Sequence, residues 1–212
     1  MKIQIIFIIL TLSFQGALAA AEPILQNLLG KIHKAPLVQF DVEKKTKSEL
    51  LGKETTSPGT IYVSPGKFRW DTQGSENSQI IYDGKTIWTV QEPPKGFKAP
   101  PQITRMKLDK KSEGQIFLNS LFHKNFDKEF EVKSKEKVKN LWKFTLIPIH
   151  KSLGVEELVL KVDDNSELKE ISYVDEIQNK IVIEINKTIL SKKGNTNLFR
   201  YQPPKGAQVN NL

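Results

Sequence analysis

Residues 59–94, GTIYVSPGKFRWDTQGSENSQIIYDGKTIWTVQEPP, give the clearest indication of the fold of this chain. Short runs of β-branched and aromatic residues are separated there by Gly, Pro, Asn and Asp, which is typical of strands joined by turns. Asp83 and Gly84 stand between two such runs, 80–82 and 86–90, and an Asp-Gly pair in this position predicts a β-hairpin. The stretch therefore predicts an antiparallel sheet with one strongly apolar face.

The flanking sequence extends this pattern. Val38, Phe40 and Val42 alternate with polar residues, which predicts a half-buried strand before the stretch. Strands are also expected at 129–133, 141–148, 155–162, 167–174, 180–190 and 198–201, and helices at 23–33 and 110–126. Because short turns join most consecutive strands, we expect an α+β protein built on an antiparallel meander.

Residues 1–20 are expected to be a secretory signal peptide. Lys2 provides a positive start, residues 3–14 are almost wholly apolar, and small residues offer a cleavage site near Ala19 to Ala21. The apolar run is shorter than the roughly 20 residues that a membrane-spanning helix needs, so an uncleaved anchor is the weaker alternative. Residues 21–212 are enough for a single domain with a substantial core.

The composition excludes several classes of protein. The chain has no cysteine, which excludes disulfides, thiol chemistry and anchoring through a lipid-bearing N-terminal cysteine. Its formal net charge of +8 could favour an anionic membrane surface or acidic partners. The lysines are scattered and form no basic helix or recognition motif, so we expect a solvated surface and no nucleic-acid binding.

The residues that usually carry catalysis or bind metals show no constellation. His33, His123 and His150 are far apart and lie in no metal-binding motif. A run that begins at Asp163 imitates a calcium loop, but Leu168 stands where that loop needs glycine. We therefore expect no metal, no cofactor and no enzymatic activity.

Aromatic and aliphatic residues two positions apart predict a continuous apolar surface, because such residues share one face of a strand. The candidates for this surface are Phe40, Val42, Phe68, Trp70, Trp88, Val90, Trp142 and Phe144. The candidates for a covering helix are Ile116, Phe117, Leu118, Leu121 and Phe122. Periodicity leaves two interpretations open: an ordinary packed core between sheet and helix, or a cavity that holds an apolar ligand.

Three short motifs resemble the LolA family of periplasmic lipoprotein carriers. Residues 64–70, SPGKFRW, are similar to the family's Pro-x-x-Phe-x-Trp strand, and residues 80–88, IIYDGKTIW, to the hairpin that follows it. Residues 199–209, FRYQPPKGAQV, are similar to the closing segment of the family. The expected order of helices and strands is also similar over nearly the whole mature chain.

The resemblance implies that residues 21–212 form one lipoprotein-carrier domain, an incomplete (unclosed) antiparallel β-barrel with an apolar cavity covered by helices. It implies a soluble, monomeric periplasmic chaperone that binds the acyl chains of lipoproteins released from the inner membrane. An inner-membrane ABC exporter would supply the acylated lipoproteins, and an outer-membrane lipoprotein receptor would accept them. The alternative is an envelope sensor, or a carrier of another lipid or glycolipid in the same barrel.

One position departs from the family pattern. The best-known members carry an arginine immediately before the strand proline, and this arginine ties the covering helix closed. The chain has Ser64 at that position, and Arg69 lies out of phase with it. Two alternatives are open: Ser64 makes a weaker hydrogen bond to the covering helix, or the contacts of that helix are purely apolar.

Overall fold

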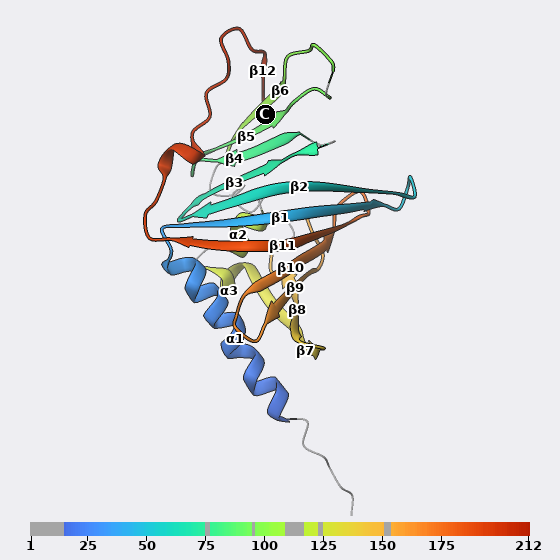
Figure 1. The fold of residues 1–212 in the computed structure, drawn as a ribbon, viewed down its shortest axis with the longest axis vertical. Helices are drawn as coiled ribbons and strands as arrows, with labels where there is room; N and C mark the ends of the chain where they lie inside the picture. Colours follow the sequence, from blue (N-terminus) through green and yellow to red (C-terminus); the bar gives the residue numbers. More distant parts are fainter. Residues whose placement is uncertain (1–14, 75–76, 95, 109–116, 123–124, 151–153) are drawn as a thin grey trace, which may run out of the picture.

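The computed structural model describes residues 15–74, 77–94, 96–108, 117–122, 125–150 and 154–212. These residues form one 12-stranded sheet in the order β12-β6-β5-β4-β3-β2-β1-β11-β10-β9-β8-β7. The neighbouring strands pair antiparallel except β12 and β6, which are parallel. Because β12 and β7 end the order, the sheet is unclosed, and the prediction of an unclosed antiparallel architecture is confirmed (Figure 1).

The strands are long at the centre of the sheet and short at one edge. The first half comprises β1 (Leu37–Ser48), β2 (Lys53–Ser64), β3 (Lys67–Thr72), β4 (Ser78–Tyr82), β5 (Thr86–Gln91) and β6 (Gln102–Lys107). The second half comprises β7 (Phe130–Val138), β8 (Leu141–Pro148), β9 (Leu158–Asp163), β10 (Leu168–Val174), β11 (Asn179–Ser191) and β12 (Val209–Asn211).

The hairpin predicted from Asp83 and Gly84 is present between β4 and β5. The Asp83 carboxylate accepts hydrogen bonds from the backbone N–H groups of Lys85 and Thr86, both at 2.9 Å. Gly84 has a φ of +99°, which disfavours residues that carry a side chain. This local chemistry fixes the register in which Tyr82 pairs with Ile87.

In the described ranges, three α-helices accompany the sheet. Helix α1 spans Gln15–Lys34 and contains Pro23, whereas the sequence predicted a helix that begins at this proline. Short helices α2 (Phe117–Leu121) and α3 (Phe126–Glu129) lie in the region where one longer helix was expected. Among the described residues, no helix has the length and apolar character needed to cross a membrane.

The two faces of the sheet are covered by different parts of the chain. The inner face packs against the helices: Val38, Phe40, Ile61, Phe144 and their neighbours join buried side chains of α1, α2 and α3 in one core cluster. The outer face of β3 to β6 is covered by residues 195–212, which we call the C-terminal strap. Figure 1 shows this segment leaving β11 and returning along the sheet to β12.

Several elements differ from the sequence-based expectation. Strand β2 begins at Lys53 and not near residue 60, and β6 and β12 were not expected at all. The strand expected at 198–201 is wrong, because Thr196–Phe199 form a 3₁₀ helix. The Asn195 side chain accepts a hydrogen bond from the Asn197 backbone N–H at 3.2 Å, and this capping favours the helical turn.

Candidate functional site

Six of the eight apolar candidates lie together on the inner face. They are Phe40, Val42, Phe68, Trp70, Trp142 and Phe144, and each is buried within the core cluster. They come from β1, β3 and β8, which the curled sheet brings around the same interior. The inner face is therefore an apolar surface built largely from aromatic side chains.

Trp88 and Val90 lie on the outer face, so grouping them with the other six was wrong. The hairpin pairs Tyr82 with Ile87, and both of these side chains belong to the inner core. Trp88 must then point to the opposite side, because successive strand residues alternate between faces. Its ring lies 5.3 Å from that of Tyr201 and 5.4 Å from the Arg105 guanidinium.

Helix α2 is a plug in the interior rather than a roof over it. Leu118, Asn119, Ser120, Leu121 and Phe122 are all buried, including the two polar residues. The Phe122 ring stacks on Phe40 of β1, with 5.3 Å between the ring centroids and 25° between the planes. A helix buried on every described side occupies space that a bound ligand would otherwise take.

The structure describes less of the other two candidates for the covering helix. Phe117 begins α2, but its side chain is not among the described parts of the chain, and Ile116 lies outside the described residues. The apolar face of α1 was not among the predicted site residues. That face contributes Leu25, Leu28, Leu29 and Ile32 to the same interior, and their helical spacing was the available signal.

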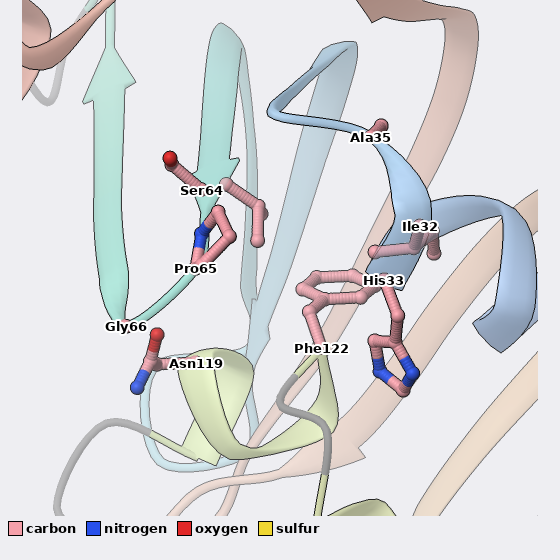
Figure 2. A pocket seen from close by; sticks show the side chains of 9 residues that line it. Ile32, His33, Ala35, Ser64, Pro65, Gly66, Asn119 and Phe122 are labelled. Atoms are coloured by element: carbon pink, nitrogen blue, oxygen red, sulfur yellow. The ribbon is translucent and has the colours of Figure 1, made fainter. Parts of the chain in front are cut away.

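A pocket of about 150 Å³ remains beside the plug. It is lined by the end of α1, the β2–β3 turn and α2, and Figure 2 shows the Phe122 ring between His33 and Pro65. An apolar cavity of about this size holds a molecule such as benzene. Buried side chains of α2 occupy part of the interior, and the larger cavity covered by helices stays a prediction.

Ser64 lines this pocket, but its hydroxyl is used elsewhere. It donates to the Pro36 carbonyl oxygen at 2.8 Å, and in Figure 2 it points away from Phe122. The bond ties the end of β2 to the connection between α1 and β1. The hydrogen bond that one alternative placed between Ser64 and the covering helix is thus directed to a different segment.

One inner-face aromatic residue is fixed by a charged partner. The Trp142 indole N–H donates to the Asp164 carboxylate at 2.8 Å, and Lys137 donates to the same carboxylate at 2.8 Å. The Lys137 ammonium and then the Trp142 N–H hold the pKa of Asp164 below its ordinary value. On the outer face, burial and then the Glu92 charge raise the pKa of Tyr201.

A second hollow lies on the outer face of β8 to β11 and has a different character. It is an open groove of about 1190 Å³ whose lining mixes charged side chains, among them Lys143 and Glu176, with apolar ones such as Val159 and Val182. Lys161 and Glu170 form an ion pair at 2.8 Å within it. An acyl chain in this groove would cover charged side chains, which lose hydration when apolar groups lie over them.

Within the described ranges, no group of His, Asp or Glu side chains could hold a metal ion. His33 borders the pocket beside α2, and His150 lies just after β8. His123 lies outside the described residues. The chemistry of the inner face is accordingly that of apolar contact and a few hydrogen-bonding groups.

Comparison with known proteins finds relatives that are named lipoprotein carriers. The family model described as "Outer membrane lipoprotein carrier protein LolA" matches residues 35–202. An outer-membrane lipoprotein carrier protein of Psychromonas ingrahamii is 22% identical over 209 residues, which cover 98% of this chain and 97% of that protein. A carrier of the same name from Actinobacillus succinogenes is 26% identical over 206 residues, 94% of this chain and 89% of that protein.

Among solved structures, a LolA superfamily protein from Nitrosomonas europaea matches 85% of this chain and 97% of its own, at 13% identity and a TM-score of 0.46. The family match spans well over half of the chain, from the end of α1 to the C-terminal strap. The chain therefore belongs to the LolA family.

Proposed function

We propose that this protein is a periplasmic carrier that holds the acyl chains of lipoproteins on its inner face. In this proposal it receives acylated lipoproteins from an inner-membrane ABC exporter and delivers them to an outer-membrane lipoprotein receptor. Its family membership and the names of its relatives support a lipid-binding carrier. The observation that carries the proposal is the buried, largely apolar plug α2 inside the curled sheet.

The plug and the acyl chains would occupy the same space in turn. The pocket of about 150 Å³ beside α2 is far too small for three acyl chains. Loading therefore requires Leu118, Leu121 and Phe122 to leave the inner face, after which Phe40 and Phe144 would contact lipid. Apolar packing has no directional requirement, so lipid methylenes can replace plug side chains without leaving polar groups unpaired.

The energies favour such an exchange in water. Three acyl chains hold on the order of 45 methylenes, and at about 0.8 kcal/mol each their exposure to water costs roughly 36 kcal/mol. Returning three plug side chains to solvent costs about 5–9 kcal/mol, at 1.5–3 kcal/mol for each. The carrier can thus keep lipid out of water by a wide margin.

The same plug would help the protein release the acyl chains. Acyl chains gain little when they move from a membrane into the protein, because both surroundings are apolar. Expelling α2 then makes loading from a membrane uphill by about the plug energy of 5–9 kcal/mol. Loading therefore needs an energy source such as an ABC exporter, and unloading into a second membrane is downhill.

Tryptophan fluorescence tests this proposal. A triacylated lipopeptide with a nitroxide on an acyl chain is titrated into the purified protein, and the non-acylated peptide is the control. We expect strong quenching from the acylated peptide, because Trp70 and Trp142 lie on the inner face. The Trp88→Phe variant should lose little of this quenching, since Trp88 lies on the outer face.

Two results would count against the carrier. One is an absence of quenching with the acylated peptide while the protein is folded. The other is equal quenching by the peptide without acyl chains, which would indicate a binding site for the peptide and not for lipid.

A further inference from the structure

Three polar atoms on the inner face are buried and have no hydrogen-bond partner in the described part of the chain. They are the hydroxyl oxygens of Thr46 and Ser57 and the indole nitrogen Nε1 of Trp70. Ser57 as a whole is only 2% exposed, and Trp70 is 7% exposed. A buried polar group without a partner costs about 1–3 kcal/mol, so three of them in one region are unusual.

The register of the sheet brings these groups together at one end of the inner face. Ser57 on β2 pairs with Lys44 on β1, and Thr46 is the next inward-facing residue of β1. Cross-strand diagonal neighbours lie roughly 7–8 Å apart, so the two hydroxyls bracket a space of about that width. The Lys44 ammonium also lies at this end, 5.7 Å from the centre of the Trp70 ring.

Gly59 brings the indole N–H into the same place. A Cβ at Gly59 would lie 3.2 Å from Trp70 Nε1 and 2.7 Å from the Asp71 carbonyl oxygen. The missing side chain therefore lets the Trp70 ring approach β2 closely, with its nitrogen over Gly59. Ser57 is the next inward-facing residue along β2, so the N–H and the Ser57 side chain face the same end of the interior.

We propose that Thr46, Ser57 and Trp70 form a polar subsite that binds the ester carbonyl oxygens at the root of the acyl chains. This inference rests on the proposed carrier function. An indole N–H only donates and a hydroxyl can donate, so the group that satisfies all three must be an acceptor. An ester carbonyl is an acceptor without a donor of its own, and it enters the interior together with its acyl chain.

The subsite gives the bound lipid a direction. Phe40 and Phe122 stack near the opposite end of β1, beside the end of α1, where Ile32 and Val63 also line the pocket. From Val38 to Lys44 the strand spans about 20 Å at 3.3 Å per residue, a length that suits an extended acyl chain. Chain ends would then lie toward α1, and the polar root of the lipid toward the β1–β2 hairpin.

Matched lipids with and without carbonyl groups test the subsite. The probes are dipalmitoyl glycerol, which has two esters, and dihexadecyl glycerol, in which ethers replace the esters. We expect the protein to bind the ester about tenfold more tightly, which corresponds to about 1.4 kcal/mol or one to two neutral hydrogen bonds. Ser57→Ala combined with Thr46→Val should bind both lipids at the affinity of the ether.

Thr145→Val is the matched control, because Thr145 is a buried strand threonine, 6% exposed, that belongs to the outer face of β8. It should keep the preference for the ester. Thermal unfolding without lipid adds an independent readout. Ser57→Ala should leave the melting temperature unchanged or raise it, because it removes an unpartnered hydroxyl group.

The outcomes separate the two proposals. Equal binding of ester and ether by the unmodified protein would overturn the subsite and leave the carrier function intact. Binding of neither lipid would overturn both. If the double variant keeps the preference, or if Ser57→Ala lowers the melting temperature as the loss of a bridging water would, the subsite is also overturned.

Discussion

The plug α2 and the C-terminal strap cover opposite faces of the same sheet by different means. Besides the buried Phe199, directional bonds hold the strap: the Arg69 guanidinium donates to the Leu198 carbonyl at 3.0 Å, and β12 pairs with β6. The plug is held by apolar contact, of which the Phe40–Phe122 ring stack is the clearest example. The strap thus depends on hydrogen bonds between particular atoms, whereas the plug depends mainly on the apolar area that it buries.

This difference indicates which covering can be exchanged for lipid. Displacing the strap would break the bond from Arg69 to Leu198 and the pairing of β6 with β12, and methylenes cannot replace hydrogen bonds. Displacing the plug separates the apolar side chains of α2 from the apolar inner face of the sheet, and an acyl chain can make the same kind of contact with that face. We therefore expect the inner face to be the exchangeable one and the outer face to be permanent.

The largest effect is expected from Phe199→Ala in the strap. Phe199 is 1% exposed, and truncation of a buried phenylalanine costs about 3–5 kcal/mol of unfolding free energy. Urea unfolding should show this loss, while the affinity for acylated lipopeptide at low denaturant stays unchanged. A large change in that affinity would show that the strap also takes part in lipid binding and is not a permanent covering.

Phe122→Ala is the matched change in the plug. The loss of unfolding free energy should be smaller, about 2–3 kcal/mol, because the pocket beside Phe122 already leaves the site loosely packed. Lipid affinity should rise about tenfold, since less apolar area must be expelled on loading. Isothermal titration with the lipopeptide measures this change, and a weakened affinity would mean that Phe122 contacts lipid and does not compete with it.

Sequence patterns predicted which strands form a hairpin, but they did not predict which face of the sheet each residue occupies. The Asp83-Gly84 hairpin was predicted because its turn residues act within a few positions of one another. Trp88 was assigned to the wrong face because β5 is apolar on both sides: Ile87 is buried inside and Val90 outside. Alternation shows which residues share a face, and only the fold decides which face is the interior.

The plug and the polar subsite also depend on information that local sequence patterns do not contain. Helical spacing of Leu118, Leu121 and Phe122 predicted a covering helix, but spacing cannot distinguish a roof from a plug. Thr46 and Ser57 are ordinary strand residues in the sequence, and their isolation from partners depends on the β1–β2 register. Such features arise from contacts between segments, which local patterns do not contain.

Ser64→Arg would give the plug a directional attachment like that of the strap. An arginine at this position can reach the pocket shared by Asn119 and the end of α1, where the helix dipole favours a positive charge. We expect an increase of up to about 1 kcal/mol in unfolding free energy, because a charge-assisted bond at a partly exposed site contributes little more. The affinity for acylated lipopeptide should fall several-fold, since this bond must break before α2 can leave.

Ser64→Ala separates this effect from the loss of the existing bond. It removes the hydrogen bond to the Pro36 carbonyl without adding a contact to α2, so lipid affinity should stay close to that of the unmodified protein. Stopped-flow quenching by nitroxide lipopeptide should show slower loading for Ser64→Arg and unchanged loading for Ser64→Ala. Equal loading rates in all three proteins would mean that α2 does not move from its place when lipid enters, and the plug would then be part of a permanent core.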